Sequence, residues 1–309
     1  MSSRPLSLAL AVVAALALTA CGGDPEPSAT SPAPAASASA SSSPSASPSA
    51  AAADEKLYVA LGDSLAAGYQ PGGAELRETA YPALTARRLG SEGAGLTVEN
   101  LGCSGETTTS LLEGGKCDYD EGSQVEQAEA LLKARAGEVG LVTIDIGGND
   151  LLRCVRAGAD IDTACVAKGV DTVEKNLPTI LERLRAAAGE DVPVLVLGYY
   201  NPWVAAKALD QPVKGVDAAA TAYTRLSSVI EDSATDAGAT FVGLDEAFAT
   251  HDTTPTTING RTVPENAARV CTLTNICTAG DIHLTDEGAA TVARVLAQAA
   301  TAAGVSSGG

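Results

Sequence analysis

Apolar residues fall into short runs that alternate with stretches of helical spacing. The apolar runs predict five buried strands, at residues 57–61, 96–101, 141–146, 192–198 and 240–244. Apolar residues spaced three and four apart predict helices at residues 81–89, 125–134, 170–188, 216–237 and 287–303. Alternating strands and helices are typical of a parallel sheet covered on both faces. We therefore expect an α/β fold: a three-layer α/β/α sandwich with about five parallel strands.

The N-terminal 20 residues have the pattern of a secretory signal. They carry one cation, Arg4, and an apolar stretch from Leu6 to Leu18, which is too short to span a bilayer comfortably. The small residues before Cys21 resemble a bacterial lipobox. That resemblance implies that Cys21 becomes the lipidated first residue of the mature protein. We expect export to the extracellular face of the membrane as a lipoprotein; ordinary cleavage and secretion is the alternative.

The composition divides the rest of the chain. Residues 21–54 are almost entirely Ala, Ser and Pro, so they cannot bury a core and are expected to form a disordered tether. Residues 55–304 have the size of one α/β domain, and residues 305–309 form a short tail.

Charge and cysteine usage exclude some functions. The 20 cations and 38 acids give a net charge of −18, which argues against nucleic acid as a partner. Cys and His do not stand at metal-ligand spacing, and we expect neither a metal nor another cofactor. Six cysteines behind a signal peptide suggest three disulfides. Fifteen pairings are possible; the close couples favour Cys103 with Cys117, Cys154 with Cys165, and Cys271 with Cys277.

Four segments are too long to be simple connections: residues 69–79, 106–122, 154–168 and 251–281. Each proposed disulfide touches one or more of them. We expect the crosslinks to fix loops around a cleft.

A candidate nucleophile follows the first predicted strand. Gly62-Asp63-Ser64-Leu65 places a hydroxyl at the carboxyl edge of the sheet, where open α/β proteins hold ligands. Taken alone, such a turn is usually an ordinary loop. A serine nucleophile needs a base, usually histidine. His251 lies in a polar stretch and is interpreted as a solvated loop residue, whereas His283 directly precedes the last helix and is the candidate base.

Two further polar turns follow the next strands. Gly105 follows the second strand and can present a backbone N–H to a cleft, and Asn149 follows the third and can donate from its amide. Acyl transfer needs such donors for the oxyanion that forms on attack. The three turns are expected at one edge of the sheet.

These blocks resemble those of the SGNH hydrolases, also called the GDSL esterase and lipase superfamily. The matching segments are Gly62 to Leu65, Ser104 to Thr107, Gly147 to Asp150 and the segment around His283. The resemblance implies a flavodoxin-like fold and a serine esterase or lipase. In it Ser64 is the nucleophile, His283 is the base, and the oxyanion hole consists of the Ser64 N–H, the Gly105 N–H and the Asn149 amide.

The chain departs from the family at one position. The family usually has Asp three residues before the histidine, where this chain has Gly280, and the acid stands at Asp281. Either Asp281 reaches the ring through a different turn, or a backbone carbonyl near Gly280 orients His283. Secreted bacterial esterases of this superfamily with three disulfides, which the cysteine placement resembles, use such a carbonyl, and we favour it.

The substrate is less clearly indicated. The segment from Tyr199 to Trp203, which carries the only Trp, either forms a wall of the substrate pocket or only packs its loop. No long apolar lid is evident, which favours short or medium acyl esters, with acetylated carbohydrates and phospholipids as alternatives. The expected partner is a small-molecule, lipid or polysaccharide ester, with membrane contact only through the N-terminal lipid. A surface lipoprotein that only binds a ligand would not need Ser64, Gly105, Asn149 and His283 together.

Overall fold

The computed structural model describes residues 55–305 except 92, 94, 156–159 and 209–212. The predicted signal peptide, the lipidated Cys21 and the tether lie outside the described residues, as does all of the predicted tail except Val305. Within the described ranges no helix is both long enough and apolar enough to cross a membrane.

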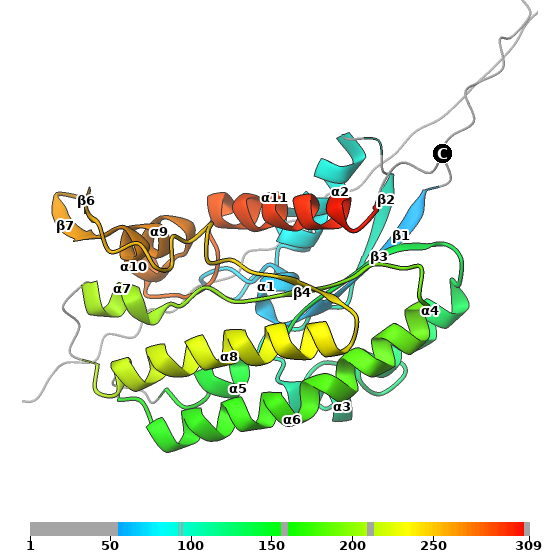
Figure 1. Cartoon of the computed structure of the whole chain (residues 1–309), viewed down its shortest axis with the longest axis horizontal. Coiled ribbons are helices and arrows are strands. Elements are labelled where there is room, and N and C mark those ends of the chain that lie inside the picture. The colour runs from blue at the N-terminus through cyan, green and yellow to red at the C-terminus, as the bar shows by residue number, and fades with distance from the viewer. Residues whose placement is uncertain (1–54, 92, 94, 156–159, 209–212, 306–309) are drawn as a thin grey trace, which may run out of the picture. The chain divides into compact units, whose positions relative to one another are not determined.

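A parallel sheet forms the middle layer (Figure 1). Its strands are β1 (Lys56–Gly62), β2 (Leu96–Asn100), β3 (Val139–Asp145), β4 (Val194–Leu197) and β5 (Thr240–Val242). The spatial order is β2-β1-β3-β4-β5, and every neighbouring pair is parallel. The predicted fold is therefore confirmed. The strand order reverses between β1 and β3, so a crevice is expected at the carboxyl ends of these two strands.

Helices cover both faces of the sheet (Figure 1). One face carries α4 (Gln124–Ala134), α6 (Thr163–Ala188) and α8 (Val216–Asp236), and the other carries α2 (Tyr81–Ser91) and α11 (Asp286–Ala302). Successive strand residues point to opposite faces, so each strand contributes to two cores. Val59 packs in the core beneath α6, whereas its neighbours Tyr58 and Ala60 pack in the core beneath α11.

Short elements lie in the connections between the main strands and helices, and most of them fall in the segments predicted to be long connections. They are α1 (Ser64–Ala67), η1 (Arg77–Thr79), α3 (Thr108–Glu113), α5 (Gly148–Leu152), α7 (Trp203–Ala208), β6 (Pro255–Ile258), β7 (Arg261–Pro264), α9 (Glu265–Leu273) and α10 (Ile276–Ala279). Most span one or two turns, too short for apolar periodicity to show. The helix predicted at 170–188 begins earlier, at Thr163, because the Asp162 side chain accepts from the Cys165 N–H and caps it.

The three predicted disulfides are present. Cys103–Cys117, Cys154–Cys165 and Cys271–Cys277 have Cα–Cα distances of 6.3, 5.6 and 5.1 Å. The first crosslinks the connection after β2, the second joins the ends of α5 and α6, and the third joins α9 to α10. All three therefore restrain connections between the main layers.

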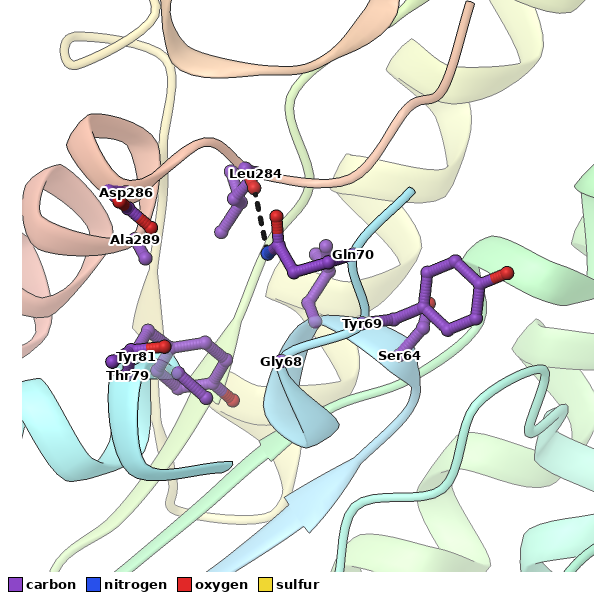
Figure 2. Close-up of a pocket in the computed structure, with 11 residues that line it drawn as sticks. Ser64, Gly68, Tyr69, Gln70, Thr79, Tyr81, Leu284, Asp286 and Ala289 are labelled. Atoms are coloured by element: carbon purple, nitrogen blue, oxygen red, sulfur yellow. Dashed lines mark hydrogen bonds between the residues drawn. The ribbon is translucent and has the colours of Figure 1, made fainter. Parts of the chain in front are cut away.

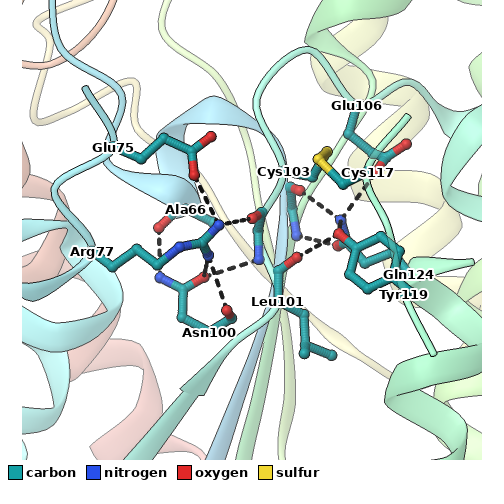
Figure 3. Close-up of polar contacts among 12 residues, drawn as sticks. Ala66, Glu75, Arg77, Asn100, Leu101, Cys103, Glu106, Cys117, Tyr119 and Gln124 are labelled. Atoms are coloured by element: carbon teal, nitrogen blue, oxygen red, sulfur yellow. Dashed lines mark hydrogen bonds and ion pairs between the residues drawn. A yellow bond between two sulfur atoms is a disulfide. The ribbon is translucent and has the colours of Figure 1, made fainter. Parts of the chain in front are cut away.

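Two polar side chains, the buried Gln124 and the half-buried Arg77, fasten the turns that follow β1 and β2 (Figure 3). The Gln124 amide accepts from the Gly62 N–H at 2.7 Å and donates to the Gly62 carbonyl at 3.0 Å. Arg77 donates to the carbonyls of Asn100 and Gly102, at 2.9 and 2.7 Å. Side chains from α4 and η1 thus add to the backbone hydrogen bonds that hold the strand ends.

Candidate active site

Ser64 is the first residue of α1, directly after the end of β1. Gly62 has φ +145°, and a Cβ there would lie 2.2 Å from Oδ1 of Asp145, so only glycine fits the turn. Asp63 caps the helix by accepting from the Leu65 N–H at 2.9 Å. Ser64 is left 8% exposed, its hydroxyl held at the carboxyl edge of the sheet.

A line of hydrogen bonds joins Ser64, His283 and Asp281. Nε2 of His283 lies 2.8 Å from Oγ of Ser64, and Nδ1 lies 2.6 Å from Oδ1 of Asp281. A carboxylate can only accept, so Nδ1 carries the proton and Nε2 is free to accept from the serine hydroxyl. Ser64 and His283, the two predicted active-site residues that lie farthest apart in the sequence, are therefore in contact.

Of the two alternatives for orienting His283, the geometry favours Asp281 over a backbone carbonyl near Gly280. The ring nitrogen contacts the Asp281 carboxylate, whose same oxygen also accepts from the His283 backbone N–H at 2.8 Å. The chain between the two residues therefore forms an Asx turn that folds the imidazole back over the carboxylate. The acid thus reaches the ring from two residues before the histidine.

The His283 loop is fastened on several sides. Asn275, two residues from the disulfide at Cys277, donates to the His283 carbonyl from its backbone at 2.9 Å and from its side chain at 3.2 Å. The Tyr200 hydroxyl donates to the Ile282 carbonyl. The Tyr69 ring lies 4.4 Å from the imidazole, centroid to centroid.

A further contact joins the His283 loop to the chain after α1. Gln70 donates to the Leu284 carbonyl at 3.2 Å (Figure 2). Together these contacts limit the positions available to the imidazole.

Asn149 links the other two turns. Its amide nitrogen donates to the Glu106 carbonyl at 3.0 Å and to the Asp63 carboxylate at 3.3 Å. Asp63 precedes Ser64 and Glu106 follows Gly105, so Asn149 stands between the two predicted backbone donors. In the described part of the chain, the N–H groups of Ser64 and Gly105 form no hydrogen bond. These two donors are available to a ligand.

Two buried acids lie behind these turns. Glu106 is 1% exposed, and burial raises the pKa of its carboxyl above its ordinary value; Oε1 has no hydrogen-bond partner in the described structure. Asp150 is fully buried, and burial raises the pKa of its carboxyl, although it accepts from the N–H and hydroxyl of Thr108 at 2.9 and 3.0 Å. Asp150 thereby joins the start of α3 to α5.

Two small cavities adjoin Ser64. One, of about 10 Å³, lies beside Tyr69 and Tyr81 (Figure 2). The other, of about 20 Å³, is lined by Tyr199, Tyr200 and Pro202. Each holds about one water. The predicted aromatic wall is therefore formed by the tyrosines.

Trp203 does not line the second cavity. Its ring packs edge-on against Tyr223, with centroids 6.5 Å apart.

The sequence did not indicate several residues that hold the site: Gln124, Arg77, Asp145 and Asn275. Gln124 and Asn275 act through backbone groups distant in sequence, and no local motif marks them. His251, interpreted as a solvated loop residue, is exposed. Among the described residues no group of three or more His, Cys, Asp or Glu side chains could hold a metal ion.

A similar solved structure supports the fold. An extracellular lipase from Streptomyces rimosus is 22% identical, with a TM-score of 0.53, and the match covers 79% of this chain and 99% of that one. Est24, a carbohydrate acetylesterase from Sinorhizobium meliloti, is 17% identical, with a TM-score of 0.46 and coverage of 80% and 99%. No curated protein matches the chain.

Residues 60–291 match the model of the GDSL-like Lipase/Acylhydrolase family. The matched range includes Ser64, Gly105, Asn149 and His283. The chain therefore belongs to the GDSL-like lipase/acylhydrolase family and is a carboxylic ester hydrolase.

Proposed function

We propose that the protein hydrolyses carboxylic esters through an acyl-enzyme on Ser64. The observation that carries this proposal is the line of hydrogen bonds from Ser64 Oγ to His283 Nε2 and from His283 Nδ1 to Asp281. A serine hydroxyl becomes nucleophilic when a neighbouring base accepts its proton and a third group orients that base.

Acylation follows from this geometry. Nε2 of His283 takes the Ser64 proton as Oγ attacks the ester carbonyl, and Asp281 stabilises the imidazolium that forms. The carbonyl oxygen becomes an oxyanion and accepts from the N–H groups of Ser64 and Gly105 and from the Asn149 amide. The 3.3 Å contact of Asn149 with Asp63 is the longer of its two hydrogen bonds and is the one that the oxyanion replaces. His283 then protonates the departing alcohol.

Deacylation repeats these roles with water. His283 takes a proton from the water that attacks the acyl-enzyme, the same donors hold the second oxyanion, and Ser64 leaves with the proton. Each step needs only side chains and backbone groups of the site. We infer no cofactor.

Replacing the nucleophile tests the proposal. Ser64→Ala removes the attacking oxygen, so kcat for a chromogenic short-chain ester should fall about 10³-fold or more. The melting temperature should stay close to that of the wild type. Ser91→Ala, at an exposed serine in α2, is the matched control and should keep full activity. Activity of Ser64→Ala within tenfold of wild type would refute the assignment.

A second variant tests the role of Asp281. Asp281→Ala leaves the tautomer of His283 unsupported, so kcat should fall about 10²-fold or more with little change in KM. Asp236→Ala, at an exposed acid in α8, is the control. If Asp281→Ala kept kcat within threefold of wild type, a backbone carbonyl would have to orient the histidine.

We propose a preference for short to medium acyl groups. Both cavities beside Ser64 are small. Among the described residues, Leu76 is the one large hydrophobic residue that is exposed. The surface described around Ser64 therefore offers little apolar area for a long acyl chain. Across p-nitrophenyl esters, kcat/KM should be highest between acetate and octanoate and at least tenfold lower for palmitate. A maximum at palmitate would contradict the preference. Acetylated polysaccharide and phospholipid in the same panel distinguish the two alternative substrate classes.

We also propose that the enzyme is exported and held at the membrane by a lipid on Cys21. Three disulfides suggest an exported protein. The lipobox-like residues before Cys21 support the anchor. In a bacterial host that processes lipoproteins, the wild type should fractionate with membranes and Cys21→Ser should not. Equal release of both proteins into the medium would contradict the anchor.

A further inference from the structure

Two buried carboxyl groups lie directly behind the nucleophile. Asp63 is 2% exposed, and Asp145, the last residue of β3, is fully buried. Gly62 pairs with Asp145 across the two strands and has no side chain, which leaves room for the Asp145 carboxyl over the backbone. The two acids are thereby brought together where β1 and β3 end.

Both carboxyls accept hydrogen bonds from neighbouring groups. Asp63 accepts from the Leu65 N–H at 2.9 Å, from the Tyr199 hydroxyl at 2.7 Å and from the Asn149 amide at 3.3 Å. Asp145 accepts from the Tyr81 hydroxyl at 2.6 Å and from the Asp63 N–H at 3.3 Å.

Among the described residues, no cation offsets the charge of the two acids. Within the described part of the chain, no Lys or Arg side chain contacts either carboxyl. The titratable groups that face the pair are five tyrosines and one further acid: Tyr58 on β1, Tyr81 on α2, Tyr199 and Tyr200 after β4, Tyr223 on α8, and Glu106 after β2. Burial raises the pKa of all five hydroxyls, so they stay neutral, and burial also raises the pKa of the Glu106 carboxyl.

The two carboxyls lie close together: Oδ2 of Asp145 is 3.3 Å from the backbone nitrogen of Asp63, and the charge of Asp63 acts on the Asp145 carboxyl. Two negative charges this close, in a buried site without a cation, would be strongly disfavoured. Ionised carboxylates only accept, so a hydrogen bond between the two requires a proton on one of them. Asp63 already accepts three donors and Asp145 two. Burial, followed by the nearby Asp63 charge, raises the pKa of the Asp145 carboxyl well above its ordinary value.

We propose that Asp145 is a neutral carboxylic acid that donates a hydrogen bond to the Asp63 carboxylate and acts as a positioning residue for the active site. The bond fills the remaining acceptor position of Asp63. It holds the carboxylate against the Ser64 turn on one side and Asn149 on the other. The effect on catalysis rests on the function proposed above; the protonation state of Asp145 does not.

Stability against pH tests the protonation state. A carboxyl that is neutral in the folded protein and ionised in the unfolded chain stabilises the fold fully only below its unfolded pKa of about 4. That stability is lost as pH rises toward the raised pKa of the folded state. Asp145→Asn keeps a neutral donor and removes this dependence. Between pH 5 and 7, the unfolding equilibrium constant of wild type should rise about tenfold per pH unit relative to that of Asp145→Asn.

The control is Glu182→Gln, which removes an exposed acid from α6 and should follow the wild type at every pH. If the ratio of the unfolding equilibrium constants of wild type and Asp145→Asn stayed constant from pH 5 to 7, the proposal would be overturned. If Asp145→Asn does not fold, ¹³Cγ-aspartate NMR replaces the stability measurement. The NMR uses the variant Asp150→Asn, because Asp150 is the other buried aspartate with a raised pKa. A neutral carboxyl resonance at pH 7 supports the proposal, and its absence overturns it.

Activity tests the positioning role. Asp145→Leu removes the donor, so its kcat for a short-chain ester should be about tenfold or more below that of Asp145→Asn. Equal kcat for the two variants would overturn the positioning role. If Ser64→Ala kept activity, the proposed function would fail, and the stability measurement would still decide the protonation of Asp145.

Discussion

The buried carboxylate of Asp63 is the group on which the arrangement of the active site depends. A charge removed from water must be satisfied by donors, and no Lys or Arg among the residues that the structure describes contacts this carboxylate. The donors come from separate parts of the chain: the Leu65 N–H, the Tyr199 hydroxyl after β4 and the Asn149 amide after β3. Because these donors all contact the Asp63 carboxylate, the turn that carries Ser64 is held close to the ends of β3 and β4.

The proposed base, His283, lies in a part of the chain that is separate from the groups around Asp63. His283 lies in a loop that Asn275 holds through the backbone and that the Cys271–Cys277 disulfide restrains nearby. Its contact with Ser64 joins the end of the chain to the end of the first strand. The site thus combines a buried polar network at the sheet edge with a separately supported loop, and the ester would react where the two meet.

Much of the fold could be predicted because the central strands β1, β3 and β4 are buried on both faces and are rich in apolar residues. The one-turn elements, and the start of α6 at Thr163, could not, because they depend on caps and crosslinks rather than on periodicity. Ser64 and His283 were identifiable from motifs close to strand and helix ends. The choice between Asp281 and a backbone carbonyl near Gly280 could not be made from the sequence, because a sequence interval does not specify the turn that spans it. Gln124 and Asp145 were missed because their partners lie on other strands and turns.

The central claim is that the turns after β1, β2 and β3 converge on one oxyanion formed at Ser64. A crystal structure of the enzyme inactivated by a small alkyl fluorophosphonate tests it most directly, because the phosphonyl oxygen stands where the oxyanion would form. The account predicts a covalent bond to Ser64 Oγ. It also predicts that the phosphonyl oxygen lies about 2.7–3.1 Å from the backbone nitrogens of Ser64 and Gly105 and from the Asn149 amide nitrogen. Modification of another residue, or a phosphonyl oxygen that points away from these three nitrogens, would contradict the account.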